Sequence, residues 1–351
     1  MKTIRIVGLH PGVKDVDSLL AMMRFNPNQF GLEFVWDEQS PDYVFVSNIM
    51  YTNKSLCKKF LAYKKNGAIS IFFTGECLIP DFNIFDYAVS FDRHLSLDDR
   101  IVRLPTYRFF DHTFMKEFQD ITIDESFVKT KTGFCNYMYS HQGHPMREKI
   151  FYDISKYKRV DSLGRYLNNT GKKSFTRHDV DWREQSIRDR LPYKFSIAAE
   201  NGLCPGYLDE KFISCLQAHT IPIYWGDPTV KEEFNPNAFI CYNDFSTVEQ
   251  LIERIKEIDE NDTLYLKILK EPWQTEAQKQ YSTQQCEKYD NFLVNIFSQE
   301  KASARRAPSG TYPEMYLYWF KKRYNQPIKH YVMSFLQKGA LSIKRHIKGR
   351  K

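Results

Sequence analysis

Residues 193–245 constrain the fold of this chain more than any other stretch, because they contain a strand, a helix and a second strand in close succession. The three elements are predicted at residues 193–199, 209–219 and 221–225. Such a unit indicates an α/β domain with a parallel sheet. Ligands bind these sheets beyond the carboxyl ends of the strands, so we expect a site at Glu200, Asn201 and the loop through Tyr207.

The helix of this unit begins with charged residues that suit an anion. Asp209 is a candidate N-cap, which places Glu210 and Lys211 in the first turn. Free backbone N–H groups and the helix dipole attract anions there, and a lysine adds a point charge for a phosphate. Spacing alone is also consistent with two solvated charges, and by itself it favours that simpler interpretation.

Length and pattern predict two α/β domains. A chain of 351 residues is too long for one ordinary core and fits two domains of about 150 residues with an appendage. Strand and helix signals alternate in the first part, a polar stretch at residues 111–131 is the candidate crossover, and strand signals restart at residues 134–139. We assign an acceptor-binding domain, a donor-binding domain and a tail to residues 1–125, 126–300 and 301–351.

Short motifs in one continuous order resemble those of the α-1,3-fucosyltransferases. They are a Glu-Asn pair, a Tyr-x-x-Glu-Lys helix start, an Ile-Pro-Ile-Tyr-Trp-Gly-x-Pro run and Phe-Asn-Pro, at residues 200–201, 207–211, 221–228 and 234–236. Further motifs lie upstream at residues 74–76, 85–88, 103–105, 147, 156–161 and 164–169. A series of this length, covering roughly residues 40–275, is far more specific than any one of its short motifs.

The resemblance implies the GT-B fold, in which two Rossmann-like α/β domains face a cleft. It also implies an enzyme that moves L-fucose from GDP-fucose to a sugar hydroxyl and inverts the anomeric centre. Three positions depart from the family pattern. Ala199 replaces a bulky apolar residue, residues 202–203 replace a small polar pair, and Asp209 replaces a threonine but keeps N-capping.

The resemblance also implies roles for individual residues. Glu76, which follows a predicted strand, matches the general base that takes the proton of the acceptor hydroxyl. Arg147 and Lys211 match cations that hold the leaving diphosphate. Four further residues match the donor site. Glu210, which we group with Glu76 as catalytic, is expected near the ribose or the fucose. Tyr207 is expected to line the nucleotide pocket, and Glu200 and Asn201 are expected near the fucose.

We expect no metal site and no required cofactor. Two cations beside a pyrophosphate can offset the charge that a divalent ion would otherwise neutralise, so such an ion would at most stimulate the reaction. Residues 15–17 and 179–181 have the Asp-x-Asp form, but two acids in a tripeptide are common by chance. His141 and His144 lack a third ligand. The sequence contains no G-x-G-x-x-G and no Walker pattern, which argues against a nicotinamide enzyme and against a P-loop kinase.

The carboxyl-terminal segment differs in charge from the rest of the chain. Residues 301–351 contain 13 basic residues and one acidic residue, whereas residues 1–300 contain 37 basic and 42 acidic residues, so the net charge of +7 comes from the tail. Its basic residues interleave with aromatic and aliphatic ones, as in an amphipathic helical segment that binds an anionic membrane surface. A solvated tail is the alternative, and nucleic-acid binding is the least favoured.

Cysteine usage and hydropathy bear on the compartment. The seven cysteines are odd in number and show no paired ligand spacing, which favours a reducing environment. No stretch approaches about 20 uninterrupted apolar residues, so we expect no spanning helix. The amino terminus reads as a first strand and helix rather than a signal peptide. The chain thus resembles the soluble bacterial type, expected in the cytoplasm at the inner face of the membrane.

The leading functional hypothesis is transfer of fucose to O3 of GlcNAc in an N-acetyllactosamine-type acceptor, as in Lewis antigens on a surface lipopolysaccharide. One alternative is a related fucosyltransferase with another acceptor or linkage. The other is a silent, membrane-attached module that binds a nucleotide or a glycan. Retention of Glu76, Arg147, Glu210 and Lys211 argues against the silent module, which has no need of all four.

Overall fold

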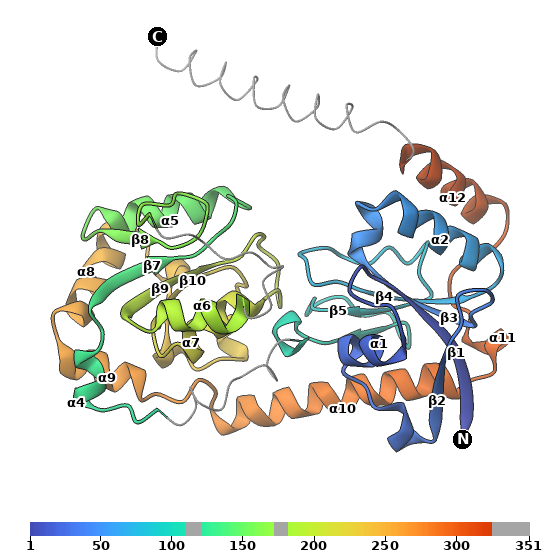
Figure 1. The fold of residues 1–351 in the computed structure, drawn as a ribbon, viewed down its shortest axis with the longest axis horizontal. Helices are drawn as coiled ribbons and strands as arrows, with labels where there is room; N and C mark the ends of the chain where they lie inside the picture. Colours follow the sequence, from blue (N-terminus) through green and yellow to red (C-terminus); the bar gives the residue numbers. More distant parts are fainter. Residues whose placement is uncertain (110–120, 172–181, 325–351) are drawn as a thin grey trace, which may run out of the picture.

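Two parallel sheets form the cores of two α/β domains in the computed structural model, which describes residues 1–109, 121–171 and 182–324 (Figure 1). The first sheet has the order β2-β1-β3-β4-β5-β6. Its strands are β1 (Lys2–Leu9), β2 (Leu32–Trp36), β3 (Tyr43–Ser47), β4 (Ile69–Phe73), β5 (Tyr87–Ser90) and β6 (Ile101–Arg103). Central strands β3 and β4 are buried along their whole length, as parallel strands covered on both faces must be.

Helices cover both faces of the first sheet. α1 (Val16–Met23) and α10 (Glu276–Ser298) pack on one face, while α2 (Lys54–Lys65) packs on the other. Asp15 caps α1 by accepting a hydrogen bond from the backbone N–H of Ser18, 2.8 Å away. The first acid of residues 15–17 therefore has a structural role.

The second sheet has the order β11-β10-β9-β7-β8, and all its pairs are parallel. Its strands are β7 (Gly133–Tyr137), β8 (Val160–Ser162), β9 (Tyr193–Ala199), β10 (Ile221–Trp225) and β11 (Ile240–Cys241). Its helices are α4 (Glu125–Lys129), α5 (Pro145–Ser155), α6 (Trp182–Arg190), α7 (Glu210–Gln217), α8 (Val248–Asp259) and α9 (Asp262–Leu269). α5, α8 and α9 contribute to the core on one face and α7 to the core on the other. This arrangement confirms the expected pair of Rossmann-like domains.

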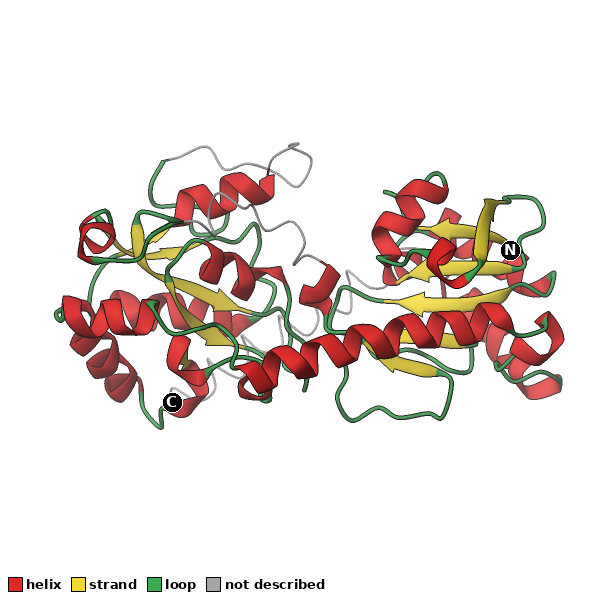
Figure 2. Cartoon of the chain, turned by 90° about the horizontal axis from the view of Figure 1, so that it is seen from below, coloured by secondary structure: helices red, strands yellow, loops and turns green. Residues whose placement is uncertain are grey.

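The long helix α10 lies within the range 126–300 that the sequence assigns to the second domain, but it packs on the first. Tyr289, Phe292, Leu293, Ile296 and Phe297 join the core of the first sheet. Their i, i+3, i+4, i+7 spacing makes one apolar stripe, and the sheet offers a complementary apolar face. Figure 2 shows α10 running from beside the second domain along the first. The chain therefore crosses between domains twice.

Part of the predicted tail also belongs to the first domain. After α11 (Lys301–Ala304), the backbone N–H groups of Arg306 and Ala307 donate to Oδ1 of buried Asp86, at 3.0 and 2.8 Å. In α12 (Thr311–Tyr324), Leu317 and Phe320 pack against the core beneath α2. Residues 325–351 lie outside the described residues, and no helix among the described ones is long and apolar enough to span a bilayer.

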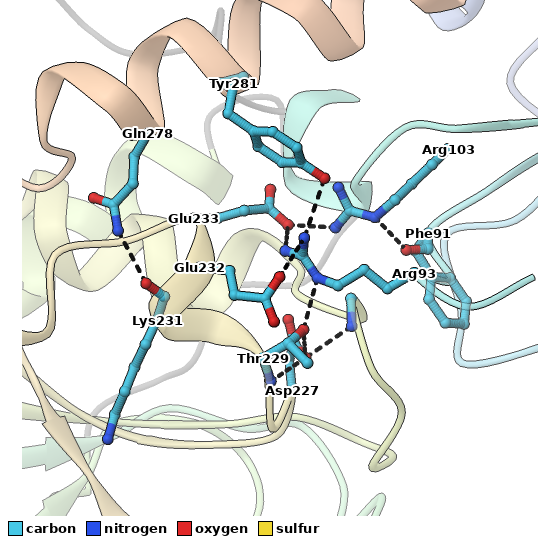
Figure 3. Close-up of polar contacts among 12 residues, drawn as sticks. Phe91, Arg93, Arg103, Asp227, Thr229, Lys231, Glu232, Glu233, Gln278 and Tyr281 are labelled. Atoms are coloured by element: carbon cyan, nitrogen blue, oxygen red, sulfur yellow. Dashed lines mark hydrogen bonds and ion pairs between the residues drawn. The ribbon is translucent and has the colours of Figure 1, made fainter.

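A buried polar cluster joins the two domains away from the cleft (Figure 3). Arg93 and Arg103 of the first domain both pair with Glu233 of the second. Arg93 Nε also donates to Thr229 Oγ1 at 2.8 Å, and the Tyr107 hydroxyl donates to the second oxygen of Glu233 at 3.1 Å. The carboxylate is thus paired on both oxygens, as a buried charge requires.

Candidate active site

A cavity of about 1360 Å³ lies between the two domains and is lined by residues of both. Five of the seven predicted site residues line it: Glu76, Arg147, Asn201, Glu210 and Lys211. Glu76 follows β4, Asn201 follows β9, and Lys211 is in the first turn of α7. The site therefore lies beyond the carboxyl ends of parallel strands, where ligands of such sheets bind.

Arg147 is a buried cation with an unsatisfied donor. It sits in the first turn of α5, only 2 % exposed, and its Nε donates to the carbonyl oxygen of Ala199 at 2.9 Å. Its guanidinium lies 4.5 Å above the ring of Tyr139. Nη2 has no hydrogen-bond partner among the described residues. A buried charged donor at a cavity wall indicates that its partner is an anionic ligand.

A glycine in the loop before α5 lies against the guanidinium of this arginine. Gly143 has φ +64°, and a Cβ there would lie 2.2 Å from Arg147 Nη1. His144 caps α5, its Nδ1 accepting from the backbone N–H of Met146 at 3.1 Å. His144 therefore serves the helix terminus that presents Arg147.

Lys211 is held among three carboxyl groups. It pairs with Asp209, and its Nζ lies 3.6 Å from Glu210 and 4.0 Å from Glu200. Burial lowers the pKa of Lys211, but the negative charges of Asp209 first and then of Glu210 outweigh burial and leave it above its ordinary value. Lys211 is therefore a permanent cation. Asp209 is the predicted N-cap of α7, accepting from the backbone N–H of Lys211 at 2.9 Å.

Glu200 is fully buried and does not line the cavity. Burial, and then repulsion from Asp209, raise the pKa of Glu200 well above its usual range, which favours the protonated form. Its Oε1 accepts from the backbone N–H of Asp209 at 3.1 Å. The side chain of Glu200 thus lies beneath the start of α7, turned toward the N-cap, and its place near the fucose stays a prediction.

Tyr207, predicted to line the nucleotide pocket, packs against the first domain. It is fully buried, its ring packs edge-on against Phe91 at 4.9 Å, and its hydroxyl lies 3.5 Å from the carbonyl oxygen of Gly75. It is not among the residues that line the cavity. Burial of the aromatic ring against the other domain makes Tyr207 part of the domain interface.

Glu76 of the first domain and Asn201 of the second are in direct contact. Asn201 Nδ2 donates to Glu76 Oε2 at 2.5 Å, and the backbone N–H of Glu76 donates to Thr74 Oγ1 at 3.0 Å. The candidate base and the candidate donor-site cations line the same cavity from different domains. A carboxylate opposite a cationic pocket can take a proton while the cations stabilise a leaving anion.

Sequence reasoning missed several cavity residues. Arg183 and Arg190 on α6 line it with Trp182, and His10 lines it from the first domain. Arg190 is buried and its Nη1 donates to the carbonyl oxygen of Ser186 at 2.6 Å. No element was predicted from the sequence at residues 182–190, and the basic residues there do not by themselves indicate which of them line the cleft.

Within the described residues, no group of three or more His, Cys, Asp or Glu side chains could hold a metal ion. Residues 179–181, the second Asp-x-Asp, lie outside them. All seven cysteines are free thiols. Metal independence remains a prediction.

Two protein families match the chain. Residues 128–305 match glycosyltransferase family 10 (fucosyltransferase) C-term, and residues 10–110 match the alpha-(1,3)-fucosyltransferase FucT N-terminal domain. A putative fucosyltransferase, R654, of Acanthamoeba polyphaga mimivirus is 36% identical over 208 residues, covering 58% of this chain and 34% of that protein. The alpha-(1,3)-fucosyltransferase FucT of Helicobacter pylori is 29% identical over 244 residues, covering 61% of this chain and 48% of the relative. The chain thus spans less than half the length of these relatives.

Solved structures match over most of the chain. A crystal structure of an alpha1,3-fucosyltransferase superposes with a TM-score of 0.67 at 22% identity, covering 88% of this chain and 93% of the other. A crystal structure with GDP-fucose gives a TM-score of 0.64 at 23% identity, covering 86% and 92%. At these identities the likeness establishes the fold, with its two domains and intervening cleft.

Proposed function

The chain belongs to glycosyltransferase family 10, the fucosyltransferases, and on that premise we propose that it moves L-fucose from GDP-fucose to O3 of GlcNAc in an N-acetyllactosamine-type acceptor. The H. pylori relative is named an alpha-(1,3)-fucosyltransferase, and a structural neighbour binds GDP-fucose. The observation that carries the proposal is the buried guanidinium of Arg147, whose Nη2 has no partner among the described residues, in the interdomain cavity that Glu76 also lines.

Arg147 and Lys211 hold the diphosphate of the donor. The unpartnered Nη2 of Arg147 and the permanent charge of Lys211 stabilise the negative charge that builds on GDP as the fucosyl bond breaks. Because both cations are fixed before the donor arrives, little reorganisation is needed at the moment of reaction. This pairing also supports a reaction without a metal ion.

Glu76 acts as the general base. The acceptor hydroxyl gives its proton to the carboxylate, and its oxygen attacks the anomeric carbon from the face opposite GDP. Direct displacement converts the β-linked donor into an α-linked product and needs no covalent intermediate on the enzyme. Glu210, at the cavity wall beside Lys211, contacts the ribose or fucose of the donor.

The acceptor and linkage are tested by product analysis. Enzyme, GDP-fucose and N-acetyllactosamine should give a trisaccharide whose NMR spectrum has one new α-anomeric fucose signal and a shifted GlcNAc C3. An α-linked product at another hydroxyl would support the related transferase with different specificity. Donor binding with no product from any glycan would support the silent module.

The exposed face of α12 supports peripheral attachment to an anionic membrane. Leu317 and Phe320 face the first domain, whereas Tyr312, Met315, Tyr318 and Trp319 are largely exposed next to basic residues. Aromatic side chains with neighbouring lysines suit the headgroup region of a bilayer. A place at the inner membrane face would bring the enzyme to lipid-linked precursors of surface lipopolysaccharide.

A further inference from the structure

A direct hydrogen bond joins Asn201 of the donor domain to Glu76, the candidate base. Asn201 Nδ2 lies 2.5 Å from Glu76 Oε2, and the two residues come from different domains. Among the described residues the other carboxylate oxygen, Oε1, has no hydrogen bond. An amide donor on one oxygen fixes the plane of the carboxylate and leaves the other oxygen for a ligand.

The loops that hold these residues are pressed together. A Cβ at Gly202 would lie 2.7 Å from both Cβ and Sγ of Cys77, the residue after Glu76. On the first-domain side, Thr74 Oγ1 fixes the backbone of Glu76 by accepting from its N–H at 3.0 Å. The glycine therefore permits the approach that the Asn201–Glu76 bond requires.

We propose that Asn201 is a positioning residue for the base: from the donor domain it holds Glu76 Oε2 and so orients Oε1 toward the acceptor hydroxyl. This inference rests on the proposed function. In the step, the hydroxyl proton goes to Oε1 and the hydroxyl oxygen forms the bond to the anomeric carbon. The bond from that carbon to the β-phosphate oxygen breaks, and its electron pair stays on GDP. The base is thus correctly oriented only when the two loops meet.

Asn201→Asp is the discriminating variant. It keeps the size of the side chain and an acceptor oxygen for any donor hydroxyl, but it replaces the amide donor by a carboxylate beside Glu76. Two carboxylates in contact disfavour a second negative charge, so the acidic limb of the kcat–pH profile should move up by about one pH unit. At neutral pH we expect kcat to fall about 10- to 100-fold, less than the largest losses seen on removing a base. The Kd for GDP-fucose should stay within twofold.

A double-mutant cycle tests whether Asn201 acts through Glu76. In a Glu76→Gln background, measured by single turnover with enzyme in excess, Asn201→Asp should cost less than twofold more, since its target is already gone. Thr229→Ala is the matched control, because it removes another interdomain hydrogen bond, to Arg93 at 2.8 Å, without touching Glu76. It should leave the pH profile unchanged.

Opposite results would overturn the inference. An unshifted pH profile, or equal losses for Asn201→Asp with and without Glu76, would mean that Asn201 does not set the base. A rise in the donor Kd that accounts for the whole defect would make it a donor contact only. Failure of the proposed function is separate, since the wild-type protein would then not turn over GDP-fucose at all.

Discussion

Replacing Arg147 by methionine should weaken GDP binding without weakening the free protein. Methionine has a similar length and can still pack on Tyr139, but it loses the charge and the bond from Nε to Ala199. It also removes the buried Nη2 that has no partner among the described residues. The loss of one hydrogen bond and the relief of one unsatisfied donor should largely offset each other in the unliganded state.

GDP binding has no such compensation, because the variant loses a hydrogen bond to the ligand and gains none. A hydrogen bond to a charged group contributes about 1.5–3 kcal/mol, and every 1.4 kcal/mol is about a tenfold change in Kd. Arg147→Met should therefore raise the Kd for GDP by roughly 10- to 150-fold in calorimetric titrations with EDTA present. The free energy of unfolding of the unliganded protein, measured by thermal unfolding, should change by no more than about 1 kcal/mol.

Arg147→Lys is the charge-matched control, and it should fall between wild type and methionine because a lysine keeps the charge but not the planar fork. If Arg147→Met bound GDP as tightly as wild type while melting much earlier, Arg147 would be a structural residue. The assignment of the diphosphate position would then be wrong.

Three further outcomes follow from the structure. Glu76→Gln should lower kcat by about 10²–10⁴-fold and leave the GDP-fucose Kd unchanged; normal turnover would remove Glu76 as the base. Asp86→Asn should lower the free energy of unfolding by about 1–3 kcal/mol. The backbone N–H and the hydroxyl of Ser70 both donate to Oδ2, and an amide nitrogen in that position is itself a donor. Although burial raises the pKa of Asp86, Lys64 and hydrogen bonds to Ala307 and Ser70 outweigh it and lower the pKa. The difference in free energy of unfolding between wild type and Asp86→Asn, measured by denaturant titration at several pH values, should be largest above about pH 4. It should shrink as the pH falls toward the pKa of Asp86 in the folded protein, and a difference that does not change with pH would refute this. Truncation after Gln326 should reduce salt-sensitive binding to anionic liposomes and spare turnover, whereas unchanged liposome binding would count against the tail.

Regular elements with strong local patterns were predicted well. The strands β9 and β10 have the bounds expected from the sequence, and Asp209 is the N-cap of α7. These elements depend on side-chain periodicity and capping, which a sequence displays directly. α10 was harder, because its apolar stripe indicates that it packs but not on which of two similar sheets.

The site was predicted in composition more than in geometry. Arg147, Lys211 and Glu76 meet at the cleft, but the buried positions of Glu200 and Tyr207 depend on how the loop from residue 200 to residue 208 folds against the first domain. Contacts such as Asn201 with Glu76 join residues 125 positions apart, and no local pattern encodes them. The same holds for the pairing of Glu233 with Arg93 and Arg103.

Release of GDP from GDP-fucose in EDTA, with and without N-acetyllactosamine, tests the central claim most directly. The cleft geometry predicts rapid release that depends on the acceptor and is lost in Glu76→Gln. Donor binding with no acceptor-dependent release, across N-acetyllactosamine and related GlcNAc glycans, would contradict fucosyl transfer by this site.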